Sequence, residues 1–479
     1  MNRTWGVLVL ILLGVLIGID WKIGILISLL SWIFMFKKTK LLLLTVMISF
    51  VFEKEKTMIL GSSFNYTYIF MMVFIFYYLI CEIDYFRELI TNKTFISFFS
   101  LFLLIAVVSQ FQSFKIDFPI TSIRPGAILN YPFIKGLTRI VETCALIIFS
   151  LCVAHYSNKT NLEKLIKWQI GIETLIILFL LFSLSSDFLF GYDAMREYTT
   201  AHSTELAVRM RGFFDEPSIL ALYLITTIPL TLSLLMNNKN NLLIIAFILQ
   251  LVSIILTFSR SGWIATLFIV LIMGYFSYKN VFIKNKRKIL FLSVFILIVL
   301  TTTYLNSVSF KKVVDKSLFE PFSEAANPYT GRFWSTKLRL EAYSAAMSAF
   351  QKHPILGVGF FNFHFYGGAK NYLALLPDLP ALNYPETNNI LLTILSETGL
   401  IGLITITYMI FVHGRYILRI SRTLEGKNKN MLIGFFSTTV GILISYMFIS
   451  KFTYNFLWFF LGLYIAFVNS QERESVKSI

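Results

Sequence analysis

The chain has 479 residues, of which 56% are hydrophobic and only 14% are charged, and it contains 49 phenylalanines and 23 tyrosines. Soluble globular domains carry about 25% charged residues, so this composition, with a mean hydropathy of +0.72, excludes a soluble protein. The formal net charge of +16 does not indicate nucleic-acid binding, because the positive-inside bias and anionic lipid headgroups account for basic loops in a membrane protein.

Apolar runs recur along the chain at lengths close to the ~20 residues that a helix needs to cross a bilayer. They predict an all-α, polytopic transmembrane helix bundle of about 14 spans, with a range of 11–14. The short third run has a re-entrant alternative, and the first is interpreted as a retained helix because no small-residue cleavage site follows it. The spans are placed at 5–19, 21–36, 41–52, 66–82, 95–110, 138–156, 164–183, 217–236, 241–258, 262–279, 289–305, 400–418, 431–449 and 453–469.

Basic residues in short loops set the expected orientation. The loop 279–288 holds five Lys or Arg residues, and 413–430 and 37–40 are also basic. The positive-inside rule makes these loops cytoplasmic. A chain of fourteen spans in the cytoplasmic (inner) membrane then has both termini in the cytoplasm and its two long loops, 184–216 and 306–388, outside.

This topology divides the chain into four parts, of which the large extracytoplasmic loop is expected to contain amphipathic helices. The parts are N-terminal transmembrane helices (1–183), a catalytic-side outer loop with its helices (184–305), the large extracytoplasmic loop (306–388) and C-terminal transmembrane helices (389–479).

Arginines cluster where the outer loops meet the spans. Arg209 and Arg211 lie in R-M-R-G-F-F-D-E-P-S, Arg260 ends a span, and Arg339 opens R-L-E-A-Y-S-A-A-M. Arginine is costly near hydrocarbon, and its planar guanidinium binds phosphate through two parallel hydrogen bonds. The alternative is ordinary solvated loop charge. As a group, these four arginines are candidates to bind a lipid-linked phosphate.

The order of these motifs resembles the superfamily of O-antigen polymerases and O-antigen ligases, Wzy-type membrane glycosyltransferases that use undecaprenyl-pyrophosphate-linked sugars. The resemblance covers roughly 205–405, and each motif alone is weak. The matching positions are Arg209, Gly212, Phe214, Pro217 and Ala221; Ser259 to Ser261; Arg339, Leu340, Tyr343, Ala346 and Pro354 to Gly359; and Asn389, Leu392, Glu397 and Gly399 to Gly402.

One departure from the family pattern favours polymerase over ligase. The position where ligases carry a histidine is Asn388 here, and asparagine takes up no proton at neutral pH. The Glu216-Pro217-Ser218 triplet is also frequent among polymerases. The alternatives that stay open are a ligase that transfers polymer to lipid A-core and, from another class, a transporter or flippase of lipid-linked glycans.

Glycosyl transfer also needs a group that activates the acceptor hydroxyl, and a carboxylate at the interface suits that role. Glu216 and Glu386 are the candidate general bases, with Asn388 as a substrate-positioning residue. Glu216 has an equally simple interpretation as a negative charge at a helix start, and Glu386 as an ordinary loop carboxylate. Pro217 is expected to open a helix.

The sequence predicts chemistry without cofactor or metal. The three cysteines lie in or beside apolar spans, and no paired-histidine spacing for zinc occurs. The resemblance implies undecaprenyl-pyrophosphate-linked glycans and membrane lipids as partners, together with a chain-length regulator and a flippase of the same pathway. No nucleic acid is expected.

Two further features belong to the large outer loop. Residues 332–352 read as an amphipathic helix, with an apolar face of Phe333, Leu340, Tyr343, Met347 and Phe350, expected to lie on the membrane as a lid. The aromatic run 357–366 either stacks on sugars or is buried at the interface.

Overall fold

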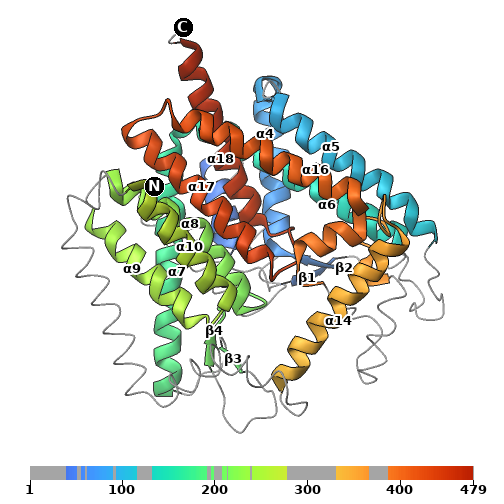
Figure 1. The fold of residues 1–479 in the computed structure, drawn as a ribbon. Coiled ribbons are helices and arrows are strands. Elements are labelled where there is room, and N and C mark those ends of the chain that lie inside the picture. The colour runs from blue at the N-terminus through green and yellow to red at the C-terminus, as the bar shows by residue number, and fades with distance from the viewer. Residues whose placement is uncertain are drawn as a thin grey trace.

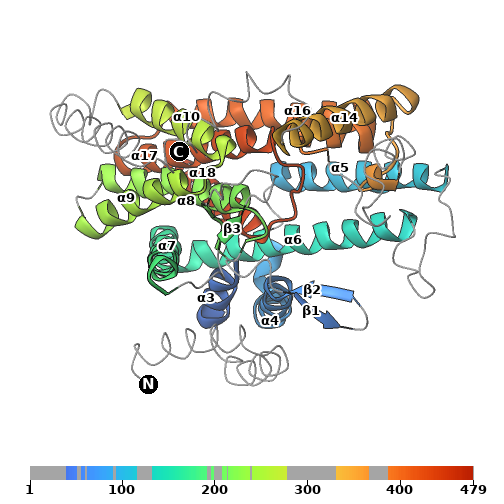
Figure 2. The ribbon, with the colours of Figure 1, turned by 90° about the horizontal axis from the view of Figure 1, so that it is seen from below.

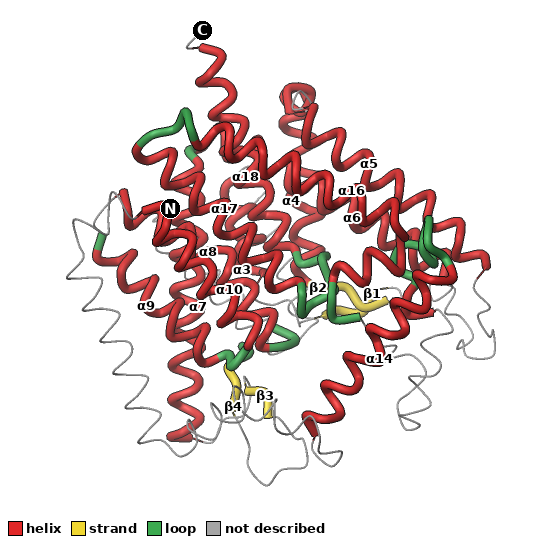
Figure 3. The backbone as a smooth tube through the Cα atoms, in the orientation of Figure 1, coloured by secondary structure: helices red, strands yellow, loops and turns green. Residues whose placement is uncertain are grey.

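The computed structural model describes residues 39–50, 56–59, 62–89, 93–115, 132–190, 196–198, 208–212, 214–237, 240–277, 331–365 and 387–477. These residues form a helical bundle with two short antiparallel hairpins (Figures 1 and 3). The hairpins pair β1 (Lys56–Ile59) with β2 (Ser62–Asn65), and β3 (Arg196–Tyr198) with β4 (Val208–Met210).

The helices are α3 (Thr39–Ser49), α4 (Tyr66–Leu89), α5 (Lys93–Gln110), α6 (Pro132–Thr160), α7 (Leu162–Phe190), α8 (Pro217–Asn237), α9 (Asn241–Leu256), α10 (Arg260–Ser277), α14 (Gly331–Lys352), α16 (Ile390–Ser421), α17 (Gly426–Tyr446) and α18 (Asn455–Lys477). Two 3₁₀ turns, η2 (Phe111–Lys115) and η8 (Phe363–Phe365), complete the described elements.

Each expected span that falls within the described residues coincides with a helix. The spans at 5–19, 21–36 and 289–305 lie outside the described residues. Within the part of the chain that the structure describes, five helical segments are long and apolar enough to cross a membrane, and four further apolar helices, in α3, α4, α9 and α10, are shorter. The helical membrane fold is therefore confirmed, while the count of about fourteen spans stays a prediction. The five segments are Phe95–Phe114, Pro132–Asn158, Leu162–Phe182, Pro217–Asn237 and Ile390–Ser421.

Small residues allow the central helices to pack closely. A Cβ atom on Gly434 of α17 would lie 2.9 Å from the Cβ of Ser233 on α8, and one on Gly441 would lie 2.8 Å from a side-chain carbon of Ile225. In a membrane, close packing between helices replaces the hydrophobic effect as the force that holds them together. Helix α8 is consequently buried along most of its length, while residues such as Phe76 on the bundle's periphery are exposed.

A polar contact joins three helices inside this apolar bundle. The carboxylate of Glu173 on α7 is completely buried, and its Oε1 accepts a hydrogen bond from Nε2 of Gln250 on α9 at 3.1 Å. One turn earlier on α7, Nε2 of Gln169 donates to the hydroxyl of Tyr223 on α8 at 2.8 Å. The sequence analysis did not single out these residues, although an ionisable residue within an apolar span is a signal in itself.

The segments that carry the sequence motifs gather at one end of the bundle (Figure 1, lower half). The two hairpins, the first residues of α8 and α10, and helix α14 lie at this end, opposite the C-terminus. Figure 2 shows α5 between α16 and α6, and α14 running alongside α16, in agreement with their contacts. Antiparallel neighbours thus bring motifs from distant parts of the sequence to the same side of the bundle.

Helix α14 forms where the sequence predicts a helix over 332–352, but its buried face differs from the expected apolar face. The residues that it buries are Ala342, Ala346 and Ala349, whereas Leu340 and Met347 are 61% and 40% exposed. Small residues let α14 approach α16 closely, which leaves the larger apolar side chains free to contact lipid. That the helix acts as a lid on the membrane surface stays a prediction.

Candidate active site

The loop after α14 crosses helix α16 where that helix is interrupted, and the two segments form hydrogen bonds to each other. The candidate site lies beside this crossing. Gly399 interrupts α16 with φ 67° and ψ −160°. The N–H groups of Leu400 and Ile401 donate to the carbonyls of Pro354 and Ile355, at 2.8 and 3.4 Å. In return the carbonyls of Ser396 and Glu397 accept from Val358 and Gly359, at 2.9 and 3.0 Å. The P-I-L-G-V-G segment therefore satisfies the backbone groups that the broken helix leaves open, as a membrane interior requires.

Glycine is required at the two positions where the chains cross. Gly357 has φ 67°, and a Cβ there would lie 2.3 Å from the carbonyl carbon of Glu397. A Cβ on Gly399 would lie 2.3 Å from the carbonyl oxygen of Ile355. Any other residue would push two backbones apart and would adopt a left-handed conformation that L-residues disfavour. Two sequence motifs, about forty residues apart, thus form one structural unit.

A cavity opens beside this crossing, and Glu397 reaches it. The Glu397 side chain is nearly buried, at 3% exposure, and its Oε2 accepts a hydrogen bond from the backbone N–H of Phe361 at 2.8 Å. The cavity offers aromatic rings, hydroxyl groups and one ammonium group, which is a suitable lining for a sugar. Its walls include Phe361, Phe363, Thr387, Thr393, Ser450 and Lys451 in addition to Glu397.

The N-terminus of α16 forms one wall of this cavity. Asn389 caps the helix, since its Oδ1 accepts from the N–H groups of Leu391 and Leu392 at 3.0 and 3.2 Å. Its Nδ2 donates to the carbonyl of Met447 at 3.3 Å, and this hydrogen bond connects the start of α16 to the end of α17. Asn388 lies in the chain between this cap residue and Thr387, which lines the cavity, and its backbone has a positive φ of 51°. Glu386 lies outside the described residues.

The arginine-rich segment before α8 lies at the same end of the bundle. Arg209 is in strand β4, where its backbone lies opposite that of Glu197 in the antiparallel register with β3. Arg211 is half-buried, and its Nε has no hydrogen-bond partner among the described residues. Phe214 is buried against Tyr223 of α8, with ring centroids 5.5 Å apart, and anchors the segment.

Glu216 lies at the start of α8, which begins at Pro217 as the sequence predicts. Its carbonyl accepts from the N–H groups of Ile219 and Leu220, and its exposed carboxylate accepts from Oγ of Ser218 at 3.0 Å. These contacts are those of a residue at a helix N-terminus, where negative charge is favourable. A role for Glu216 as general base stays a prediction.

Arg260 and Arg339, from two different motifs, approach each other. Arg260 is the first residue of α10, Arg339 is in α14, and the two guanidinium groups interact electrostatically. Both side chains are exposed. Two like charges at the positive end of a helix repel each other and the helix dipole, so an anion bound between them would relieve that repulsion.

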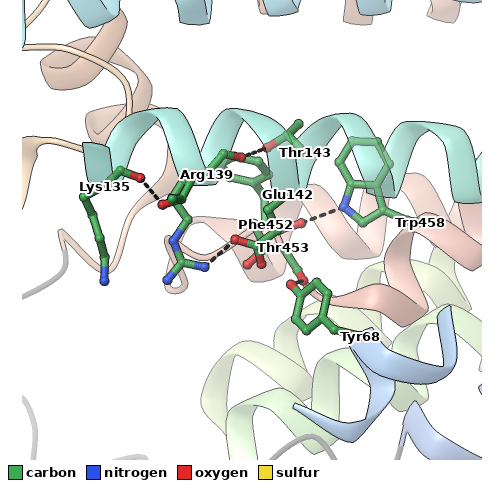
Figure 4. Close-up of polar contacts among 9 residues, drawn as sticks. Tyr68, Lys135, Arg139, Glu142, Thr143, Phe452, Thr453 and Trp458 are labelled. Atoms are coloured by element: carbon green, nitrogen blue, oxygen red, sulfur yellow. Dashed lines mark hydrogen bonds and ion pairs between the residues drawn. The ribbon is translucent and has the colours of Figure 1, made fainter. Parts of the chain in front are cut away.

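A charged network on α6 adjoins the cavity (Figure 4). Arg139 forms an ion pair with Glu142 one turn later, and its guanidinium carbon lies 4.5 Å from the centroid of the Phe361 ring. Tyr68 of α4 donates from its hydroxyl to the carbonyl of Thr453 at 2.7 Å. The network fixes the loop between α17 and α18, which carries the cavity residue Lys451, beside α6.

The sequence analysis missed Arg139 and Lys451 as neighbours of the site, and treated Glu397 only as a motif position. A signal for Arg139 was present, because Arg139 and Glu142 are charges three residues apart at the start of an apolar span, and such charges face the protein interior. Lys451 carried no such signal, since only the folded chain brings the loop after α17 to the cavity.

Residues 245–407 match the sequence model of a family described as O-antigen ligase. A search of curated proteins found no match. The matched region contains Arg260, Arg339, the P-I-L-G-V-G segment and the break in α16, so it includes most of the site described above. The family comprises ligase- and polymerase-type glycosyltransferases of the membrane, and the match over residues 245–407, about a third of the chain, supports the resemblance to the O-antigen ligase and polymerase superfamily.

Proposed function

We propose that the protein is a polymerase that joins undecaprenyl-pyrophosphate-linked oligosaccharide units into an O-antigen or capsule-type polysaccharide. The observation that carries this proposal is that Arg260 and Arg339, from two separate sequence motifs, lie close enough for their charges to repel each other. A pair of arginines that could hold an anion and a small pocket lined by hydroxyl groups, aromatic rings and one ammonium group match a substrate that has both a pyrophosphate and a glycan.

The chemistry follows from these groups. When the anomeric carbon–oxygen bond breaks, negative charge develops on the departing pyrophosphate, and guanidinium groups fixed nearby stabilise it. Arg209, Arg211, Arg260 and Arg339 are the residues that we propose for this role. Because arginine supplies the positive charge, the proposed reaction needs neither a metal ion nor a cofactor.

Asn388 supports polymerase over ligase. Ligases of this family resemble this chain but carry a histidine at that position, and the amide of Asn388 cannot replace an imidazole as proton acceptor. We propose that Asn388 positions substrate at the mouth of the cavity, next to Thr387. The ligase function remains the second candidate, because the matching family is described as O-antigen ligase.

The proposal places the site on the outer face of the cytoplasmic membrane, with both termini in the cytoplasm. The substrates would reach the site from the outer leaflet after a flippase delivers them, and a chain-length regulator would act on the same polymer. The test is deletion of the gene, followed by electrophoresis of the cell's polysaccharide. A polymerase deletion leaves single repeat units attached, whereas a ligase deletion leaves no attached polymer, and a transporter deletion stops export altogether.

A further inference from the structure

Glu397 lies two residues before the break in α16, and the hydrogen bonds at this break hold it in a fixed position beside the cavity. The backbone on both sides of Glu397 is held by the P-I-L-G-V-G segment, through Val358 to Ser396 and Gly359 to Glu397. The N–H of Phe361 then fixes one carboxylate oxygen at 2.8 Å. A group held by packing and hydrogen bonds in this way is preorganised for chemistry.

Glu397 also has the surroundings that a proton acceptor for a sugar hydroxyl needs. Of the described residues that line the cavity, it is the one carboxylate, and the hydroxyls of Thr387, Thr393 and Ser450 lie in the same walls. Glu216, by comparison, is exposed and occupied with the N-terminus of α8. A buried carboxylate beside a pocket is better placed to act as a base than one facing solvent.

We propose that Glu397 is the general base of the transfer and that the cavity beside it receives the acceptor sugar; this inference rests on the proposed glycosyl transfer. The acceptor hydroxyl oxygen forms a bond to the donor's anomeric carbon while the bond from that carbon to the pyrophosphate breaks. The bonding electrons leave with the polyprenyl pyrophosphate. The hydroxyl proton passes to the Glu397 carboxylate and from there to water, so the carboxylate is regenerated.

The test uses the purified full-length protein in proteoliposomes with lipid-linked repeat units. Glu397→Gln keeps an oxygen that accepts from Phe361 but takes up no proton. We expect its kcat to fall ~10²–10⁴-fold, with a nearly unchanged KM and unchanged protein yield. The acid limb of the pH–rate profile, present in the wild type, should disappear. Glu397→Asp, which keeps the carboxylate one methylene further back, should retain that limb at a reduced rate.

Chemical rescue separates a base from a structural residue. Glu397→Ala opens space for a small carboxylate, so added formate should restore part of its activity, an effect that a merely structural role would not produce. Glu425→Gln, at the N-cap of α17, is the matched control and should keep wild-type turnover. Near-normal turnover and an intact acid limb in Glu397→Gln would overturn the proposal for Glu397 while leaving the polymerase function in place.

The wild-type protein is assayed first with two acceptors, a lipid-linked repeat unit and lipid A-core. Transfer to either one identifies the acceptor on which the Glu397 variants are then compared. Wild-type protein that transfers to neither contradicts the proposed function and with it this inference. The two failures are therefore distinguishable, because one is read from the wild type and the other from the variants alone.

Discussion

At the residue scale, the proposed site separates into arginines that we propose bind an anion and a pocket whose described lining residues include one carboxylate. The arginine positions could be predicted from the sequence, because a guanidinium at the end of an apolar span is costly and calls for an explanation. Their proximity could not, since Arg260 and Arg339 are 79 residues apart and only the folded chain brings their charges near each other. Glu397 was visible as a motif residue, but its access to the cavity depends on the kink at Gly399.

Replacing either arginine of the pair should abolish polymer formation without lowering protein yield. Arg260→Ala and Arg339→Ala each remove a charge-assisted contact worth about 1.5–3 kcal/mol, and lysine at either position should restore activity only in part because it lacks the guanidinium fork. The measurement is polymer length on gels from cells that express each variant at equal levels.

The matched control is Arg422→Ala at the other end of α16, where the residue caps the helix on the side opposite the site. It should leave polymer unchanged. If the two arginines share one anion, the double variant should lose little more than either single variant. Normal polymer from both single variants would remove the pyrophosphate assignment.

At the scale of elements, the helices were predictable and their junctions were not. Apolar runs of the right length mark α5 to α10 and α16 to α18, with ends that differ from the observed helix ends by up to ten residues, because a membrane forces a continuous helix. The expected span at 400–418 begins just after the kink at Gly399. The sequence did not show that helical residues also precede the kink, back to Ile390. For α14 the period predicted the helix and an apolar face toward the membrane, but it did not show that Ala342, Ala346 and Ala349 are the residues buried against the rest of the protein.

The crossing predicts that alanine at either of its two glycines has a much larger effect than alanine at a glycine elsewhere in α16. Gly399→Ala and Gly357→Ala should each lower the melting temperature of the purified protein and abolish activity, because a Cβ would meet backbone atoms at 2.3 Å. A strained left-handed residue adds about 1–3 kcal/mol.

Gly414→Ala, further along α16, meets nothing within 4 Å and should be neutral or slightly stabilising, since alanine favours the helix by up to ~1 kcal/mol. The comparison is made by thermal unfolding in detergent. Equal melting temperatures for all three variants would show that the loop and the broken helix do not cross as described.

At the scale of the whole molecule, the proposed function requires the site to face the outer side of the cytoplasmic membrane. The helices alternate in direction, and the motif-bearing ends collect on one side, away from the turn where Glu163 of α7 pairs with Lys427 of α17. The basic loops predict that this turn is cytoplasmic and therefore that the motif-bearing ends face in the outward direction.

Cysteine labelling determines that direction. In a background without Cys81, Cys144 and Cys152, a cysteine at Ser344 on exposed α14 should react with a membrane-impermeant thiol reagent in intact cells. One at Glu425, at the opposite end, should react only after the cells are opened. The reverse pattern would place the site in the cytoplasm and exclude an outer-face polymerase.

The most direct measurement of the central claim is synthesis by the purified protein in proteoliposomes, with undecaprenyl-pyrophosphate-linked repeat units as the only substrate and a chelator present. We predict a ladder of products that differ by one repeat unit, with release of undecaprenyl pyrophosphate at each step, and no ladder from Arg339→Ala. Products that appear only when lipid A-core is added would contradict the polymerase assignment and identify the protein as a ligase.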